Sequence, residues 1–424
     1  MGHYSTRFLL RDFPSDLLFT FERRQRMIPE VRKTFNDNFS EATYQKAVDT
    51  IETRYPGDLV FKVAETPVFL SEKLVQQLED ASSQIVSQLE DKTLLSRMNA
   101  AVPKDYFVPG EEGKCEMFSL DFGICKNEEG AVVPQLIELQ GFPTMFLFQE
   151  IEAEAYRKAY HIDDTWTNFF NNYNSLRYVQ LLKDLILKGF RPEEVVLLEL
   201  QPETQKTRID FTITEERLGI PVVCISSLTE ENGNVYYEKD GKKTQVRRVY
   251  NRMIFDDLEA HRHQLKKYLD ITQPLNVEWC PHPNWFYKIS KYTLPFLKSD
   301  YVPSTSFLSE VEEMPKDLEN YVLKPLFSFA GQGVVIDVTP DALSRIKDPQ
   351  NWILQKKVQY EPLIKTPDEN AVLEIRLMFF RDPKTDKPVL VNNLVRLSKG
   401  KMVGVRYNAD KRWVGSSIAF FQSS

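Results

Sequence analysis

The chain has 424 residues, 42% of them hydrophobic, so it is long enough to bury more than one core, and we expect roughly two to three domains. Its formal net charge of −7 comes from 54 basic and 61 acidic residues that are mixed along the sequence. No basic tract predicts binding to nucleic acid or to an anionic membrane surface. The N-terminal stretch lacks the apolar core of a signal peptide, and no run of about 18 apolar residues predicts a membrane span, so we expect a cytoplasmic protein without membrane contact.

Helical periodicity dominates residues 15–100. Within residues 70–95, apolar side chains recur at helical spacing and form one stripe, which predicts a helix that packs against a core or a domain interface. The stripe consists of Leu74, Leu78, Ile85, Val86 and Leu89.

Two apolar runs follow, at residues 115–126 and 131–140, and the sequence NEEG joins them. This linker ends in a glycine, the residue type that a hairpin turn favours. We therefore expect the two runs to form an antiparallel β-hairpin.

Polar side chains interrupt this predicted hairpin. Because strand side chains alternate between faces, Glu138 and Gln140 are expected to point the same way as Leu136. Ser119 and Asp121 share a face of the preceding strand, so Asp121, Glu138 and Gln140 can converge across the pair. Two carboxylates and a carbonyl oxygen are hard ligands suited to Mg²⁺. The alternative is a hydrogen-bonded sheet edge on which the carboxylates are merely solvated.

Residues 145–189 again have a helical pattern, and three short β runs follow at residues 193–200, 216–228 and 247–254. Such alternation predicts a compact αβ unit with a mostly parallel sheet. The pattern changes near residue 280, where we expect a linker.

A lysine and a glycine pair lie within residues 321–338, where the pattern is strand, lysine, short loop, strand. Lys324 would stand at the end of the first strand, and Gly331 and Gly333 would let the loop backbone approach a ligand closely. Backbone N–H groups in such a loop can hold phosphate oxygens while a lysine supplies positive charge. The alternative is an ordinary hairpin with a G-x-G turn.

Charged residues also occur inside the apolar strands near the C-terminus. The run AVLEIRLMFF carries Glu374 and Arg376 on one face, and the later strands add Arg396, Arg406 and Asn408. Such residues must be paired, solvated at a cleft or bound to a ligand. Structural ion pairing, for example of Glu374 with an arginine, is the alternative to a functional role.

The four cysteines have neither a C-x-x-C spacing nor a neighbouring histidine pair. We therefore expect reduced, partly buried thiols rather than a zinc site or a disulfide framework. These cysteines are Cys115, Cys125, Cys224 and Cys280.

Taken in order, these motifs resemble a circularly permuted ATP-grasp fold, similar to that of the glutathionylspermidine synthase-like family, because the acidic hairpin precedes the lysine and glycine loop. FSLDFG and LIELQGFPT resemble the R-x-D-F and E-x-N-A-D-T-P-T segments of that family, and HPNWFYKISKYTLPFL resembles its N-P-x-W…N-K stretch. YVLKPLFSFAGQGVVI matches its lysine and glycine-loop motif, WILQKKV its adenine hinge, and GVRYNADKRWVGSSIAFF its terminal G-I-R-E segment. The motifs span residues 115 to 420, approximately.

The resemblance implies an α/β (α+β) architecture, with a Rossmann-like preATP-grasp domain, and the cofactors ATP and Mg²⁺. It implies three parts: residues 1–165 with the metal-binding hairpin, the preATP-grasp domain at 166–280, and the lysine, glycine-loop and hinge portion at 281–424. Arg248 and Arg252 of the middle part would reach substrate. The implied metal ligands are Asp121, Glu138 and Gln140, and the implied nucleotide-binding residues are Lys291, Lys324, Ser328, Gly331, Gln332, Gly333, Gln355, Lys357 and Val358.

Three departures from the family pattern concern the substrate end of the site. Gln140 replaces the usual asparagine, which changes the metal geometry, and the sequence GFPT replaces A-D-T-P-T. Ser119 stands where the synthase has an arginine that would stabilise the charge developing on an acyl phosphate or a tetrahedral intermediate. Arg376, Arg396 or Arg406 would have to supply that charge instead.

The leading hypothesis is therefore an ATP-dependent ligase that joins a small-molecule or peptide carboxylate to an amine and releases ADP and phosphate. The rival hypotheses are a protein that binds Mg-ATP as a regulatory module without turnover, and a structural αβ protein without nucleotide. The sequence predicts neither the identity of the acid and amine nor the oligomeric state.

Overall fold

The computed structural model describes residues 28–142, 144–328, 331–400, 403, 408 and 410–422. The helical prediction for the N-terminal region is confirmed within these residues. The stripe predicted for residues 70–95 lies on α4, which begins after Ser71 and buries Leu74, Leu78, Ile85 and Leu89, while Val86 is partly buried. The helices of this region are α2 (Pro29–Asn38), α3 (Glu41–Arg54), α4 (Glu72–Leu89) and α5 (Lys92–Met98).

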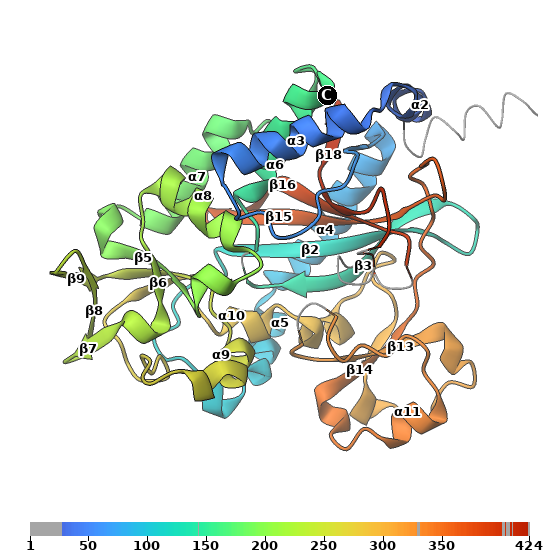
Figure 1. The fold of residues 1–424 in the computed structure, drawn as a ribbon. Helices are drawn as coiled ribbons and strands as arrows, with labels where there is room; N and C mark the ends of the chain where they lie inside the picture. Colours follow the sequence, from blue (N-terminus) through green and yellow to red (C-terminus); the bar gives the residue numbers. More distant parts are fainter. Residues whose placement is uncertain are drawn as a thin grey trace, which may run out of the picture.

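A five-stranded antiparallel sheet forms the centre of the molecule, with the strand order β17-β16-β15-β2-β3 (Figure 1). The predicted hairpin is confirmed as β2 and β3, and β2 pairs on its other side with β15, which lies some 250 positions later in the chain. Helix α4 packs on one face, and α3, α6 (Phe148–Tyr160) and α7 (Ser175–Leu187) cover the other. The five strands are β2 (Met117–Lys126), β3 (Val132–Gln140), β15 (Val372–Asp382), β16 (Lys387–Ser398) and β17 (Gly415–Ser417).

A β-bulge in the hairpin changes which side chains share a face. Asp121 pairs with Glu138 but Phe122 pairs with Leu136, so Ile137 is the extra residue on β3. Leu136 therefore turns into the core with Leu139 and away from Glu138. The prediction that Leu136 shares the face of Glu138 and Gln140 was wrong, because strict alternation assumes a strand without a bulge.

A second sheet is wholly parallel, with the order β11-β10-β5-β6, and it confirms the predicted αβ unit. The β run predicted at residues 216–228 is mostly wrong: helix α8 extends through Leu218 and ends where Gly219 adopts a left-handed conformation (φ 75°), so only residues 222–224 form the strand. A small antiparallel sheet of β7 (Thr229–Glu231), β8 (Asn234–Lys239) and β9 (Lys242–Val246) precedes β10. The parallel unit consists of β5 (Val195–Glu199), α8 (Arg208–Leu218), β6 (Val222–Cys224), β10 (Arg248–Asn251), α9 (Phe255–His261) and β11 (Glu278–Cys280).

A third sheet, of order β12-β14-β13, projects with α11 at the lower right of Figure 1. The strand predicted after the glycine pair is reduced to one antiparallel bridge between Leu323 and Val335, because Gly331 and Gly333 both have a positive φ and keep the chain in a turn. Its elements are β12 (Thr305–Phe307), β13 (Tyr321–Pro325), α11 (Pro340–Ser344) and β14 (Trp352–Lys356). A small sheet of β1 (Val68–Phe69), β18 (Ala419–Gln422) and β4 (Trp166–Thr167) joins three segments that lie far apart in the sequence.

The predicted division at residues 165 and 280 stays a prediction. Near the second position, α10 (Trp285–Lys288) and a short 3-10 helix, η7 (Lys291–Phe296), connect the parallel sheet to the third sheet. Within the described residues, none of the helices has the combination of length and apolar character that crossing a membrane requires. The four cysteines are free, as expected.

Candidate functional site

Two lysines that lie far apart in the sequence meet beside the bulged hairpin. Lys324 Nζ, at the end of β13, donates to Gln355 Oε1 at 2.6 Å and to the carbonyl oxygen of Ile137 at 3.1 Å. Lys291 Nζ, at the start of η7, donates to the carbonyl oxygen of Ser328 at 2.6 Å and pairs with Glu138 Oε1 at 3.1 Å. The structure thus brings together three segments that the sequence motifs placed in one site.

The bulge explains how Lys324 is held. Ile137 is the extra residue of the hairpin, and its carbonyl oxygen accepts from Lys324 Nζ. Gln355 is buried on β14, and its other polar atom, Nε2, donates to Thr305 Oγ1 at 3.0 Å. Burial lowers the pKa of Lys324 to about 8, although Glu138 opposes this shift.

Asp121 forms the most buried ion pair of this region. Its carboxylate accepts two hydrogen bonds of 2.7 Å from Arg376, through Nε and Nη2, and one of 2.6 Å from Arg396 Nη2. Burial alone would raise the pKa of Asp121, but Arg376 and Arg396 outweigh it and hold the pKa below its ordinary value. The geometry follows from the sheet register, which sets Arg376 directly opposite Asp121, with Glu138 on the far side.

The ion pairs continue along the same face of the sheet. Glu374 lies opposite Arg396, with Oε2 and Nη2 3.0 Å apart, so the ion-pairing alternative proposed for Glu374 is confirmed. Burial raises the pKa of Glu374 despite Arg396, and Tyr360 donates a hydrogen bond to the same carboxylate. A Cβ on Gly123 would lie 2.7 Å from Tyr360 Cε1, so this glycine makes room for the tyrosine ring.

The hairpin residues do not fit a magnesium ion as they are arranged. Both oxygens of Asp121 already face guanidinium groups, and Glu138 faces Lys291, so the predicted ligands turn toward protein cations. Opposite Gln140 lies Ser119, which is fully buried and whose hydroxyl has no hydrogen-bond partner. Among the described residues, no group of three or more His, Cys, Asp or Glu side chains is arranged to hold a metal ion.

The remaining predicted nucleotide residues are more scattered. Ser328 contributes its carbonyl oxygen to Lys291, while its buried hydroxyl lacks a partner. Gly331 and Gly333 have φ values of 70° and 74°, as a close backbone turn requires, and Gln332 between them is exposed.

Among the described residues, two of the three that were predicted to form the adenine hinge, Lys357 and Val358, make no hydrogen bond or ion pair with Lys291 or Lys324 that would support the prediction. Lys357 turns away from Lys324, because its Nζ donates to the carbonyl oxygen of Glu319 and lies 3.9 Å from Asp337. Val358 follows β14 and is partly buried. Whether Gln355, Lys357 and Val358 contact an adenine stays a prediction.

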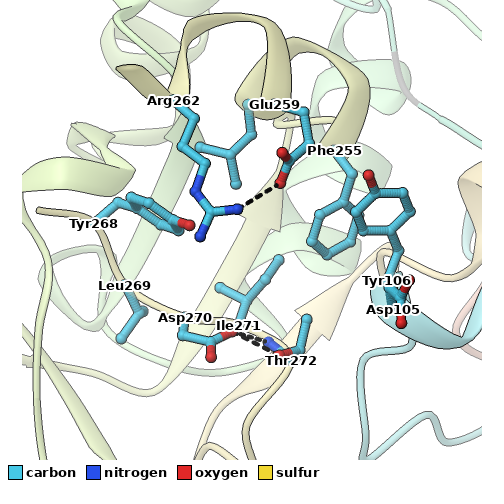
Figure 2. Close-up of a pocket in the computed structure, with 11 residues that line it drawn as sticks. Asp105, Tyr106, Phe255, Glu259, Arg262, Tyr268, Leu269, Asp270, Ile271 and Thr272 are labelled. Atoms are coloured by element: carbon cyan, nitrogen blue, oxygen red, sulfur yellow. Dashed lines mark hydrogen bonds and ion pairs between the residues drawn. The ribbon is translucent and has the colours of Figure 1, made fainter. Parts of the chain in front are cut away.

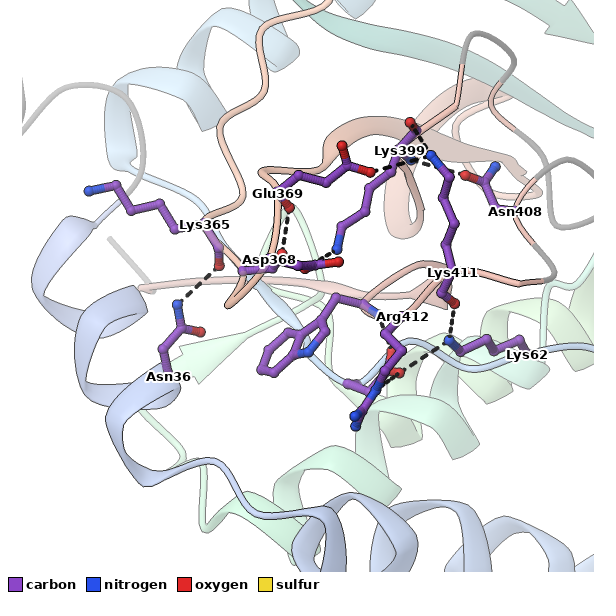
Figure 3. Close-up of polar contacts among 12 residues, drawn as sticks. Asn36, Lys62, Lys365, Asp368, Glu369, Lys399, Asn408, Lys411 and Arg412 are labelled. Atoms are coloured by element: carbon purple, nitrogen blue, oxygen red, sulfur yellow. Dashed lines mark hydrogen bonds and ion pairs between the residues drawn. The ribbon is translucent and has the colours of Figure 1, made fainter.

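Arg406 lies outside the described residues, but residues around it show how this part of the chain is attached (Figure 3). Lys399 Nζ pairs with Asp368 at 2.5 Å, and Lys411 Nζ donates to the carbonyl oxygen of Lys399 at 2.7 Å. Asn408 Oδ1 accepts from the backbone N–H of Lys399 at 3.0 Å. These contacts tie the end of β16 to the segment before β17.

Arg248 and Arg252, the two arginines of the run RRVYNRMI, have different surroundings. Arg248 is held structurally, since it donates to the carbonyl oxygens of Leu185 and Ile186 and pairs with Glu278 at 2.8 Å. Arg252 is 2% exposed, yet its Nε and Nη1 have no hydrogen-bond partner. This difference singles out Arg252 as the arginine available to a ligand.

Arg252 lies at the carboxyl edge of the parallel sheet, directly after β10. Its guanidinium lies 5.0 Å from the ring centre of Phe142 and 5.1 Å from that of Phe211. The neighbouring strand β5 ends at Glu199, whose pKa burial raises to about 8 although Arg252 opposes the shift. The chain continues from β5 to β6 on one side and returns to β10 on the other, so the two residues flank the switch point at which such sheets bind ligands.

Gly141 connects the hairpin to this second region. Its N–H donates to the carbonyl oxygen of Ile289 at 2.7 Å, and a Cβ there would lie 2.2 Å from the carbonyl oxygen of Trp285. The glycine of GFPT is therefore required for the close approach of α10 to the end of β3. Thr144, from the same segment, accepts a hydrogen bond from Arg376.

Sequence reasoning missed Glu199 and Tyr360 as neighbours of the site, whereas Thr144 belongs to the GFPT segment that the motifs assigned to its substrate end. Glu199 ends an apolar strand with a carboxylate, and this position at the edge of a predicted parallel strand was a usable signal. No comparable signal was present for Tyr360, because its contact with Glu374 depends on β15 lying beside β2.

A separate cavity of about 260 Å³ lies beside α9 (Figure 2). None of the predicted site residues lines it. Arg262 reaches into it over the ring of Tyr268 and pairs with Glu259 at 3.5 Å, so a cation of the protein itself already meets its carboxylate and aromatic groups. We therefore place the functional site at the hairpin and the switch point.

Comparison with known proteins supports the fold but not a family. No protein-family description and no curated protein sequence matches the chain. Among solved structures, the chain is similar to a glutathione synthetase-like effector from Globodera pallida in its apo form, with a TM-score of 0.53 and 14% sequence identity. The match covers 91% of this chain and 97% of that one, so the two share an overall fold.

Proposed function

We propose that the chain binds ATP beside the hairpin and uses it to join a carboxylate to an amine. The γ-phosphoryl group would pass to a carboxylate oxygen of the acid, ADP would leave, and the amine would attack the acyl phosphate and displace phosphate. The single observation that carries this proposal is that Lys291 and Lys324 meet at adjacent residues of the hairpin, Glu138 and Ile137, because two ammonium groups from separate segments suit a polyphosphate. The shared fold supports the same reaction class.

Arg252 supports an anionic acceptor. A buried guanidinium with two unpartnered nitrogen atoms is unfavourable unless a ligand completes its hydrogen bonds, and a carboxylate is the anion that matches its planar fork. Glu199 beside it would meet an amino group of the same acid. An amino acid or a small peptide therefore suits this edge of the sheet.

The test is ADP release by the full chain with a panel of acids and amines, each offered alone and together. The proposal requires ADP and phosphate, with full turnover only when both co-substrates are present; release of AMP would contradict it. We expect Lys324→Met to slow turnover by roughly 10²- to 10³-fold, as when a transition-state donor is lost. Lys316→Met, at an exposed position, is the matched control and should change nothing.

A second function, nucleotide binding without turnover, is favoured by the surroundings of Asp121 and Ser119. Arg376 and Arg396 occupy the carboxylate of Asp121, and the hydroxyl of Ser119 cannot supply the charge of the family's arginine. Calorimetry distinguishes the two functions. Tight ATP binding without any turnover over a broad panel of acids and amines would favour the binding module.

A further inference from the structure

Each carboxylate on the hairpin side of the site already has a basic partner from the protein. Asp121 contacts Arg376 and Arg396, and Glu374 contacts Arg396. Glu138 contacts Lys291 at 3.1 Å. In ATP-grasp enzymes a divalent cation would be expected here. In this chain, Arg376, Arg396, Lys291 and Lys324 supply four positive charges beside the three carboxylates.

The balance of charge disfavours a metal ion at this position. A divalent cation near Asp121 would meet the two guanidinium groups at close range, and it could bind only after displacing one of them from a fully buried carboxylate. Arginine cannot give up its charge at accessible pH, so the repulsion is permanent. A phosphate group, in contrast, is favoured here, because the four protein cations outnumber the three carboxylates by one.

Arg396 has capacity left for such a phosphate. Its side chain is 29% exposed, in contrast to 8% for Arg376, and its Nε is buried without a hydrogen-bond partner. Asp121 and Glu374 both contact its Nη2 atom. The guanidinium is therefore fixed in place while part of its donor edge stays unused.

Building on the proposed ATP site, we propose that Arg376 and Arg396 replace the hairpin-bound magnesium, so that this chain binds a nucleoside triphosphate without a divalent ion held by Asp121. Arg376 fixes Asp121, and Asp121 and Glu374 in turn fix Arg396. Arg396 then supplies positive charge to the phosphates together with Lys291 and Lys324.

Calorimetry of the full chain with a nonhydrolysable ATP analogue, once with excess EDTA and once with excess MgCl₂, tests this. We expect dissociation constants that agree within about threefold, a difference well under the roughly 1.4 kcal/mol that a factor of ten represents. Binding that appears only with MgCl₂, or tightens by more than about tenfold, overturns the inference but keeps the proposed ATP site. Absence of binding under both conditions overturns the proposed function and the inference with it.

A second measurement uses the metal alone. Titration of Mn²⁺ followed by electron paramagnetic resonance, without nucleotide, should show no bound ion in the unaltered protein. Arg396→Gln removes one of the two guanidinium groups that donate to Oδ2 of Asp121 and takes positive charge away from the phosphates, so it should weaken analogue binding in EDTA by about tenfold or more and let MgCl₂ restore part of it. Arg345→Gln, which removes an exposed arginine paired with Asp341, is the matched control. Mn²⁺ bound by the unaltered chain, or an Arg396→Gln variant with unchanged binding in EDTA, contradicts the inference.

Discussion

The hairpin region and the switch-point region of the site treat buried charge in opposite ways. Around Asp121, every carboxylate has a basic partner and the side chains hold one another through ion pairs of 2.6–3.0 Å. Around Arg252, a guanidinium that is 2% exposed keeps two nitrogen atoms without partners and lies between two aromatic rings. Asp121 and Arg252 are both almost fully buried, at 0% and 2% exposure, so burial alone does not explain the difference.

This contrast separates what the fold requires from what a ligand would complete. A buried ion-pair network stabilises its geometry only while all its members are present. An unpartnered buried charge costs stability in the free protein and is relieved when an anion binds. We therefore expect substitution of Asp121 to act mainly on stability, and substitution of Arg252 mainly on ligand affinity.

The largest effect is expected for Asp121→Asn. The change leaves Arg376 and Arg396 buried side by side without their shared anion, which should lower the free energy of unfolding by about 3–5 kcal/mol. Urea denaturation followed by circular dichroism measures this loss. Asp341→Asn breaks the exposed pair with Arg345 and, as the control, should cost less than about 1 kcal/mol. Equal losses for both variants would show that the buried network does not carry the stability assigned to it.

The next effect concerns Arg252→Met. Methionine keeps the apolar contacts with Phe142 and Phe211 and removes two buried nitrogen atoms that lack hydrogen-bond partners, so the free energy of unfolding should stay the same or rise. The affinity for the acid should fall by roughly 30-fold, or about 2 kcal/mol, the value of a hydrogen bond to a charged group. The apparent KM for the acid in the ADP-release assay measures it. A clear loss of stability with an unchanged KM would mean that Arg252 stabilises the fold and does not bind the acid.

Some features of this site could be predicted from the sequence and others could not. Local patterns sufficed for the hairpin, the parallel sheet and the convergence of Asp121 with Glu138, because alternation and turn residues act over a few positions. The pairing of Asp121 with Arg376 joins strands 255 positions apart, and no local pattern records which strand lies beside β2. That neighbour decides whether the carboxylate faces a metal or an arginine.

The bulge at Ile137 was equally hidden. A single extra residue reversed the face of Leu136 and provided the carbonyl oxygen that holds Lys324, yet LIELQ has no glycine or proline to mark it. Gly219 is the opposite case, because a glycine at this position is a visible signal for the end of a helix. It indicates that residues 216–218 belong to α8 and not to the strand predicted from residue 216. One error thus fell where no local signal marked the backbone, and the other where a local signal was present but was not used.

A smaller effect should link the two regions through Gly141→Ala. The added Cβ would lie 2.2 Å from the carbonyl oxygen of Trp285, so α10 must move away from the end of β3. We expect a loss of about 1–2 kcal/mol in the free energy of unfolding, typical of overpacking, together with a lower affinity for both the nucleotide and the acid. Gly189→Ala, where no atom lies within 4 Å but φ is 85°, measures backbone strain alone, which Gly141 lacks because its φ is not in the left-handed region. If Gly141→Ala keeps the stability of the unaltered protein, the close approach to Trp285 has no effect.

The smallest effect is the pH dependence of nucleotide binding through Lys324. Burial lowers its pKa from 10.5 to about 8, so below this pH the folded protein holds the ammonium form that phosphate requires, and above it the neutral amine. Affinity for the ATP analogue should therefore fall by about fourfold between about pH 7 and about pH 8.5, as the protonated fraction decreases. Because the unfolded chain still binds the proton between pH 8 and 10.5, the stability of the ligand-free protein should rise over that window, opposite in sign to the affinity. Lys324→Met should abolish both trends, while Arg252→Met should leave both intact; a falling stability in the same window would contradict the buried position assigned to Lys324.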